Sequence, residues 1–335
     1  MKRRSFLKMA GFGSAAGVID RLYGNGYTKQ NRLLIKPKRL KKGDTVALTA
    51  PAGILYDELE FDRMKGDLEA FGFNVVFGEF IRESYGYFSG RDYQRALDLN
   101  RFFADPQVDG IIAVRGGWGC SRIVPYLDFE RIRNNPKVYC GFSDNTTLHL
   151  AFLANSGLVS FHGPNGASEW NEFTRQSFRD VVIDGKLAEY CSVSKVQTLY
   201  TGTAEGRLTG GNLSILVTSM GTPYEPDPEG AILFVEDIGE EPYKVDRMLT
   251  HLARAGFLDK ISGFIFGQCT DCEPDGSRGF TMEEVIQHHI LPLKIPAVMG
   301  MDIGHDDLNF TIPVGVKASL DADIGTLRLL ESGVM

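Results

Sequence analysis

Short apolar runs alternate with longer amphipathic stretches from residue 44 to residue 164. The runs predict strands at 45–51, 74–78, 110–114, 138–142 and 158–164. The stretches between them predict helices at 57–73, 91–106, 121–136 and 145–157. Apolar strands separated by helices are typical of a mostly parallel sheet that helices cover on both faces. We therefore expect a doubly wound N-terminal α/β domain at 33–164.

The second half of the chain has a different pattern. Residues 165–200 are polar and irregular, which favours a linker. After it, strand-like segments dominate, at 205–220, 230–239, 261–268, 297–305 and 311–330. Helical periodicity is clear only at 243–257 and 281–290. We expect a C-terminal α+β domain at 201–335.

Composition places the chain among ordinary globular proteins. Of its 335 residues, 43% are hydrophobic and 24% are charged, which allows a substantial core. The net charge of -7, with basic clusters only near the N-terminus and at 36–44, argues against a nucleic-acid partner. No apolar run of about 18 residues occurs, so we expect no stable membrane insertion.

The first residues carry a targeting pattern. The segment KRRSFLK at 2–8 is followed by the weakly apolar MAGFGSAAGVI at 9–19. This order resembles a twin-arginine export signal, which a receptor reads and which does not span the membrane. We assign residues 1–32 to a signal and lead-in and expect a periplasmic protein, or a cytoplasmic one if the signal is not functional. A disordered basic tail is the alternative.

Five cysteines do not make a disulfide framework in a chain of this length. Cys269 and Cys272 follow the apolar run 261–268, and the sequence leaves open whether they form a local disulfide. A zinc site that adds His288 and His289 has poor geometry, because adjacent residues on a helix point about 100° apart. We expect no metal.

A serine occupies a sharp corner between a strand and a helix. In VYCGFSDNTTLHLAF, at 138–152, a short apolar strand breaks at a glycine, presents Ser143 and turns at once into a helix. A hydroxyl held there is exposed beside the N–H groups of the helix start, as an attacking serine requires. The alternative is that Ser143, Asp144 or Asn145 merely caps the helix.

A second strand end of the first domain is also unusual. The strand 110–114 ends in RGGWG, at 115–119, where close glycines let the backbone approach a ligand and turn its amides inward. Ligands of open α/β sheets bind beyond the carboxyl ends of the strands. The alternative, a dinucleotide fingerprint, has a different glycine spacing and follows the first strand. We expect no cofactor.

A serine nucleophile needs a basic partner, and six histidines are available. His305 is the best candidate, because it follows a predicted strand and opens a polar turn after a glycine. His162 also ends a strand and could border the site, with a structural role as the alternative. The others lie on predicted helices, where packing or surface roles are expected: His149, His251, His288 and His289.

The base in turn needs a carboxylate that orients it. Glu236 ends the apolar run 231–235, so we expect it to be at least partly buried and to need a partner. The alternatives are a structural salt bridge of Glu236 with Arg247 or Arg207, and Asp237 as the orienting carboxylate.

Taken together, eight segments resemble the LD-carboxypeptidase family of serine peptidases, which includes muramoyl-tetrapeptide carboxypeptidases and microcin C immunity peptidases. They occur in the family's order and span nearly the whole chain after the signal. The segments are 43–53, 115–119, 125–129, 141–152, 161–164, 206–216, 234–252 and 303–316. Two departures lie beside the expected site: Trp118 stands where tyrosine is common, and Asn145 where an aliphatic residue is usual.

The resemblance implies a role for each candidate residue. The family's catalytic triad of serine, glutamate and histidine falls on Ser143, Glu236 and His305, and the site lies in the cleft between the domains. Main-chain amides of Gly117 and Asp144 form the oxyanion hole. The side chains offered for substrate binding are Arg115, Trp118 and Arg207.

The resemblance also implies the reaction and the partners. The substrate is a murein tetrapeptide, cleaved before its terminal D-alanine without a metal, and the protein is a homodimer. One alternative is a peptidase of the same fold that inactivates a peptide antibiotic. Another is a non-catalytic periplasmic peptide-binding protein. A glutaminase-like amidotransferase would use cysteine, but Cys140 lies inside a strand, three residues before the corner.

Overall fold

The computed structural model of the chain describes residues 33–273 and 279–335. The export signal expected at residues 1–32 lies outside this range and stays a prediction. Within the described range, no helix is both long enough and apolar enough to cross a membrane.

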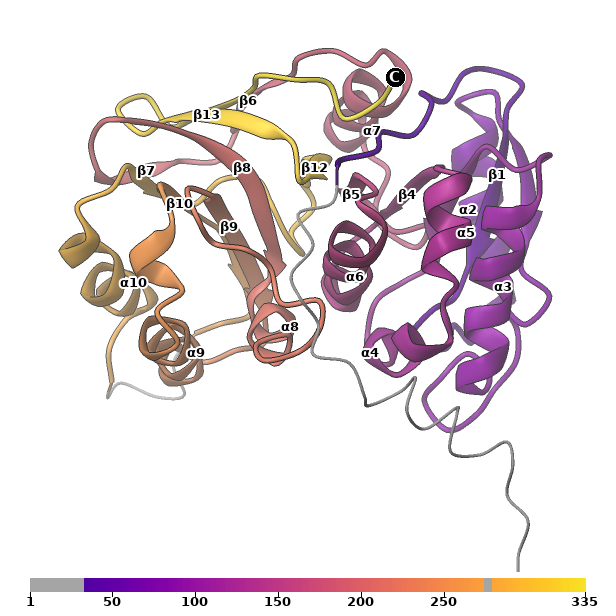
Figure 1. Ribbon diagram of the computed structural model, residues 1–335, viewed down its shortest axis with the longest axis horizontal. Coiled ribbons are helices and arrows are strands. Elements are labelled where there is room, and N and C mark those ends of the chain that lie inside the picture. Colours follow the sequence, from indigo (N-terminus) through magenta and orange to yellow (C-terminus); the bar gives the residue numbers. More distant parts are fainter. Residues whose placement is uncertain (1–32, 274–278) are drawn as a thin grey trace, which may run out of the picture. The chain divides into compact units, whose positions relative to one another are not determined.

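The first sheet has six strands in the order β12-β5-β4-β3-β1-β2 (Figure 1). Five of them run parallel, and β12 is antiparallel to β5. The five parallel strands are β1 (Thr45–Thr49), β2 (Asn74–Phe77), β3 (Gly110–Ala113), β4 (Val138–Gly141) and β5 (Ser160–His162). The sixth, β12 (Ile312–Val314), comes from near the end of the chain.

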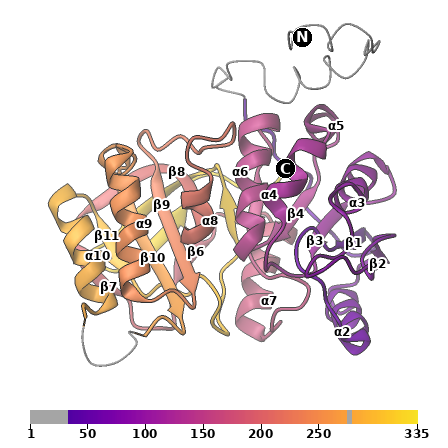
Figure 2. The same cartoon turned by 90° about the horizontal axis from the view of Figure 1, so that it is seen from below.

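Helices cover both faces of this sheet, as Figure 2 shows. Adjacent residues of a strand point to opposite faces. Accordingly, Val46 and Leu48 of β1 share a core with α2 and α7, whereas Ala47 lies in a core with α3 and α6. These helices and the shorter ones beside them are α2 (Glu58–Glu69), α3 (Asp92–Ala104), α4 (Cys120–Ile123), α5 (Phe129–Asn134), α6 (Thr146–Ser156) and α7 (Glu172–Phe178), with 3-10 turns η1 (Val124–Tyr126) and η2 (Ser143–Asn145).

The second sheet has eight strands in the order β6-β14-β13-β8-β9-β10-β11-β7. Its centre, β8 to β11, is parallel, and its flanking strands are antiparallel. The strands are β6 (Glu189–Cys191), β7 (Gln197–Tyr200), β8 (Thr203–Asn212), β9 (Ile232–Ile238), β10 (Gly263–Thr270), β11 (Ala297–Met299), β13 (Lys317–Asp321) and β14 (Thr326–Leu329).

One face of the second sheet packs against three helices, while its other face shares the core that contains α2 and α7. The helices are α8 (Leu213–Thr218), α9 (Pro242–Arg254) and α10 (Met282–Ile290), with 3-10 turns η4 (Leu258–Lys260) and η5 (Leu291–Leu293). The expected architecture of an N-terminal, mostly parallel α/β domain and a C-terminal mixed domain is therefore confirmed.

The segment 165–200 is more ordered than the linker expected there. It contains α7, a π-helical turn at Arg179–Ile183, and the strands β6 and β7, both of which form edges of the second sheet. Asn171 caps α7 by accepting a hydrogen bond from the Thr174 amide. Along β7, half-buried and exposed residues alternate. Edge strands bury only one side, so their polar composition hides them from a search for apolar runs.

The strand β12 lies after the domain boundary expected at residue 201 but belongs to the first sheet. Ile312 and Val314 pair with His162 and Ser160 of β5, so a piece of the C-terminal half completes the N-terminal sheet. His305 lies seven residues before this strand. The chain therefore returns to the first domain directly after it has placed His305.

Candidate active site

Ser143 stands at the corner where β4 ends and α6 begins. Phe142 is extended, with φ -146°, and Ser143 then has φ +64°, a left-handed conformation that costs a residue other than glycine free energy. Such a strained strand-to-helix turn is how hydrolases of the α/β type present a nucleophilic serine. Gly116 approaches so closely that a Cβ there would lie 2.7 Å from Ser143 Cβ. The corner therefore requires glycine on its neighbouring loop.

The Gly-rich turn at residues 115–119 is fixed to this corner by the side chain of Asp144. The buried carboxylate of Asp144 accepts a hydrogen bond of 2.8 Å from the Cys120 amide, just after the turn. Burial raises the pKa of Asp144. Gly117, with φ +105°, has the backbone of a turn that only glycine adopts readily. The Asp144 amide belongs to the first turn of a helix, where N–H groups have no partner within the helix.

An amide network under the corner was not expected from the sequence. Asn145 donates from Nδ2 to the Phe142 carbonyl at 3.0 Å and to Asn165 Oδ1 at 3.2 Å, and it accepts from the Tyr139 hydroxyl at 2.6 Å. Asn165 Oδ1 also accepts from the Phe142 amide at 3.2 Å. The only signal in the sequence was that Asn145 departs from the aliphatic residue usual in the family.

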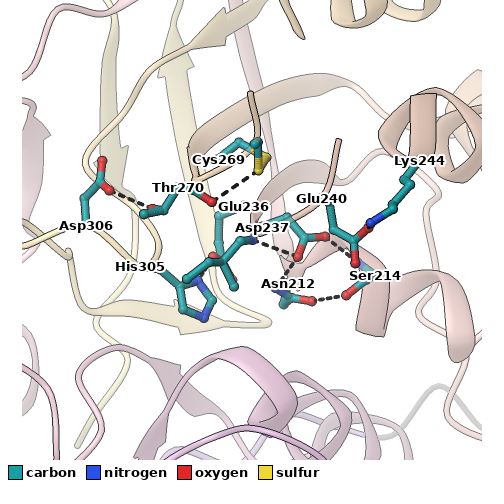
Figure 3. The surroundings of a disulfide bond; sticks show 12 residues. Asn212, Ser214, Glu236, Asp237, Glu240, Lys244, Cys269, Thr270, His305 and Asp306 are labelled. Carbon is teal, nitrogen blue, oxygen red and sulfur yellow. Dashed lines mark hydrogen bonds and ion pairs between the residues drawn. A yellow bond between two sulfur atoms is a disulfide. The ribbon is translucent and has the colours of Figure 1, made fainter. Parts of the chain in front are cut away.

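His305 and Glu236 form a hydrogen-bonded pair, with 2.7 Å between His305 Nδ1 and Glu236 Oε2 (Figure 3). Glu236 lies on β9 and is fully buried, while the His305 side chain is 13% exposed. Gly304, with φ +134°, allows this contact, because a Cβ there would lie 3.0 Å from Glu236 Oε2. The glycine before His305 is therefore part of the pair's geometry.

The surroundings of His305 favour its protonated form. Burial lowers the pKa of His305, but the hydrogen bond to Glu236 and the charges of Glu236, Asp237 and Asp306 outweigh it, so the net shift is upward. This is the electrostatic arrangement that stabilises an imidazolium once a base has accepted a proton.

Asp237, the alternative orienting carboxylate, and the two arginines expected as alternative partners of Glu236 have other contacts. Asp237 accepts hydrogen bonds of 2.9 Å from Asn212 Nδ2 and from the Ser214 amide, and burial, with the charge of Glu236, raises its pKa to about 6. Arg207 pairs with Asp227 at 3.1 Å. Arg247 lies over the ring of Tyr243.

Phe142 brings the two halves of the site together. Its ring centroid lies 4.7 Å from that of His305, and Phe142 directly precedes Ser143. In the described part of the chain, His305 is hydrogen-bonded to Glu236 and not to Ser143. Catalytic hydrogen bonds in hydrolases are often long or poorly aligned before a substrate is bound. The residue before Ser143 therefore packs against the ring of the histidine that is hydrogen-bonded to Glu236.

The remaining histidines near the corner are structural. His149 contacts Ser160 Oγ and the Gly141 carbonyl, each at 2.8 Å, and burial lowers its pKa to about 4. His162 packs between Phe142 and Phe234, and burial lowers its pKa well below the usual value. Burial thus favours the neutral form of both rings, whereas the pKa of His305 is raised.

A pocket of about 470 Å³ lies beside the Gly-rich turn. Arg115 lines it and donates one hydrogen bond, to the Ile54 carbonyl at 3.2 Å. Trp118 also lines it and is 43% exposed. The other lining residues are Gly53, Ile54, Tyr56, Tyr87 and Gly117. Arg207, the third side chain expected to bind substrate, does not line this pocket.

Cys269 and Cys272 form a disulfide in the structure, which resolves the alternatives that the sequence left open.

His289, one of the histidines considered for a zinc site, contacts Asp246 at 2.6 Å. Within the part of the chain that the structure describes, no group of three or more His, Cys, Asp or Glu side chains could hold a metal ion.

A strained corner serine, a buried carboxylate–histidine pair and a two-domain α/β frame define a serine hydrolase. Two family models match the chain, the LD-carboxypeptidase N-terminal domain at residues 46–163 and the LD-carboxypeptidase C-terminal domain at residues 205–320. The chain belongs to the LD-carboxypeptidase family, whose members are serine-type enzymes.

Three relatives illustrate this membership. A probable murein peptide carboxypeptidase of Bacillus subtilis is 37% identical, over 89% of this chain and 95% of that protein. A muramoyltetrapeptide carboxypeptidase from Oxalobacter formigenes is 31% identical, with a TM-score of 0.74 over 85% of this chain and 97% of that one. The microcin C7 self-immunity protein MccF of Escherichia coli, in its structure without ligand, is 25% identical, with a TM-score of 0.84 over 90% of this chain and 100% of that one.

Proposed function

We propose that the chain is a serine carboxypeptidase that hydrolyses the amide bond before the terminal D-alanine of murein tetrapeptides. The observation that carries this proposal is the 2.7 Å hydrogen bond between Glu236 and His305, next to the Ser143 corner. The descriptions of two relatives as murein peptide and muramoyltetrapeptide carboxypeptidases support the substrate.

The proposed reaction begins with attack of Ser143 Oγ on the scissile carbonyl. Because His305 Nδ1 faces Glu236, its Nε2 carries the lone pair that accepts the serine proton. The amides of Gly117 and Asp144 stabilise the tetrahedral oxyanion. His305 then donates the proton to the leaving amine of D-alanine, and water hydrolyses the acyl-enzyme by the same steps in reverse.

Mass spectrometry of the purified protein with a disaccharide tetrapeptide tests this function. We expect the loss of one alanine mass from the tetrapeptide that ends in D-alanine. A tetrapeptide that ends in L-alanine is the matched control and should stay intact. If the tetrapeptide that ends in D-alanine stayed uncleaved at high enzyme concentration, murein tetrapeptides would be excluded as the substrate.

We further propose that Arg115 binds the terminal carboxylate of the substrate. A hydrogen bond to a charged group contributes about 1.5–3 kcal/mol, so Arg115→Gln should raise KM by about 10- to 100-fold with a smaller change in kcat. Steady-state kinetics with a D-alanine and a D-alaninamide substrate measures this. The variant should lose the preference of the wild type for the free acid. An equal rise in KM for both substrates would mean that Arg115 only supports the backbone at Ile54 through its hydrogen bond to that carbonyl.

The pH dependence should follow His305. The base must be neutral to accept the serine proton, and the carboxylates around it raise its pKa, so kcat/KM should fall as the pH drops through a value above about 6.5. The pH profile of kcat/KM measures this limb. Asp237→Asn is the control, because Asp237 titrates nearby, with a pKa of about 6. Disappearance of the limb in that variant would assign it to Asp237 instead.

One observation favours a second candidate substrate. The TM-score to the microcin self-immunity protein is 0.84, compared with 0.74 to the muramoyltetrapeptide carboxypeptidase. A peptide antibiotic of the microcin type therefore belongs in the same assay as a second substrate. Cleavage of that peptide alone would favour the immunity function.

A further inference from the structure

The Cys269–Cys272 disulfide closes the end of β10, the strand beside Glu236. Cys269 pairs with Asp237 of β9, and Thr270 pairs with Ile238. The disulfide therefore begins opposite the residue that follows Glu236 (Figure 3). The Gly239 amide donates to the Thr270 carbonyl at 2.8 Å. The end of β10 is therefore fixed to the strand that carries Glu236.

The same strand end also holds the segment that carries His305. The Gln268 amide donates to the Ile303 carbonyl at 2.8 Å, two residues before His305. The Thr270 hydroxyl donates to Asp306 Oδ1 at 2.6 Å, one residue after His305. Figure 3 shows the contact between Thr270 and Asp306 beside His305. Residues 268–270 thus contact the chain on both sides of the base.

This part of β10 has an irregular backbone. The pairing register with β9 shifts between Phe266 and Cys269, and Asp271 has φ +54°, a conformation that costs a residue other than glycine free energy. A disulfide across three residues closes only a short loop, so it constrains the unfolded chain little. Its main effect is local, on the position of Thr270.

We propose that the Cys269–Cys272 disulfide and Thr270 position His305 for catalysis, so that opening the disulfide with a dithiol lowers turnover. This inference rests on the proposed role of His305 as the base. Cys269, Cys272 and Thr270 are positioning residues, since they act through Asp306 and the backbone rather than on the substrate.

The redox step is a dithiol–disulfide exchange. A thiolate of the dithiol attacks Sγ of Cys269, a half-buried residue, and Cys272 leaves as a thiolate. The second thiolate of the reductant attacks the mixed disulfide and releases Cys269. Two electrons pass from the dithiol, which becomes a disulfide, and the two cysteine thiolates take up protons from solvent according to their pKa values.

Reduction of the disulfide should lower the pKa of His305, because it should move a negative charge away from the ring. The titratable groups that face it are Glu236 and Asp237 on β9, Asp306 on its own segment, and His162 on β5. Only Asp306 is held by Thr270. Once the strand end is released, Asp306 should lie farther from the ring on average, and the pKa of His305 should fall.

The experiment compares oxidised and dithiothreitol-reduced wild type, with Thr270→Val, Thr270→Ser and the double variant Cys269→Ser/Cys272→Ser. Alkylation and mass spectrometry count the thiols released. Misplacement of a catalytic group by about 1 Å costs on the order of 100-fold, so we expect kcat to fall about tenfold or more on reduction, with KM changed less than about twofold. Reoxidation should restore kcat. Thr270→Val should show the same loss, and Thr270→Ser should retain activity.

Two controls make the result specific. The double variant should be slow and insensitive to dithiothreitol, while Cys191→Ser, which removes an exposed free thiol, should behave as wild type. NMR titration of His305 needs no substrate, so a lower pKa on reduction would support the inference even if the tetrapeptide is not cleaved. Release of two thiols with kcat and the His305 pKa both unchanged would overturn it.

Discussion

Replacing Ser143 with alanine is expected to lower kcat for D-alanine release by about 10⁴- to 10⁶-fold, the loss typical of removing a triad serine. The variant keeps the Glu236–His305 pair and the pocket, so KM should change little. Progress curves at high enzyme concentration measure the residual rate. A fluorophosphonate probe, which labels an activated serine, should label wild type at one site and leave the variant unlabelled.

Two further variants separate loss of the nucleophile from loss of the fold. Ser143→Gly should be as inactive as Ser143→Ala, yet unfold at no lower temperature, because glycine adopts φ +64° without steric cost. Ser121→Ala, on the neighbouring α4, should keep wild-type kinetics. Substantial D-alanine release by Ser143→Ala would show that another group attacks the carbonyl.

Replacing Glu236 with glutamine should have the second-largest effect, a fall in kcat of about 10⁴-fold. The glutamine amide can donate to His305 Nδ1, which would turn the proton of the ring to Nε2 and remove the lone pair that Ser143 needs. Glu236 is fully buried, and its Oε1 accepts no hydrogen bond in the described part of the chain. The neutral side chain should therefore not destabilise the fold.

Kinetics and thermal unfolding together measure this prediction. Asp237→Asn is the matched control, since Asp237 is the neighbouring buried carboxylate but bonds to Asn212 and Ser214 rather than to His305. It should lose less than about tenfold in kcat. If both variants lost activity equally, the orienting role could not belong to Glu236 alone.

The main features of the fold and the candidate site could be predicted because they depend on local patterns. Apolar runs that end at glycines identify β3 and β4, and the corner at Ser143 is encoded in consecutive residues. Glu236 was expected to be at least partly buried because it ends an apolar run, and the structure shows it fully buried. The eight ordered segments identified the family, which the family models confirm.

The remaining features depend on partners far away in the sequence. Asn165 supports the corner from 20 residues beyond Asn145, and no local pattern marks that contact. The edge strands β6 and β7 are polar because they bury one side only, and β12 looks like part of the second sheet until its pairing with β5 is seen. The disulfide could not be predicted, because its formation depends on a backbone turn at Asp271.

The position of β12 has a consequence for the order in which the enzyme is made. Synthesis proceeds from the N-terminus, so the ribosome delivers Ser143 long before His305, and the edge of β5 stays unpaired until Ile312–Val314 emerge. The residues that complete the first sheet therefore arrive directly after His305. An unfinished chain therefore contains Ser143 without His305, and the candidate catalytic residues come together only when nearly the whole length has been translated.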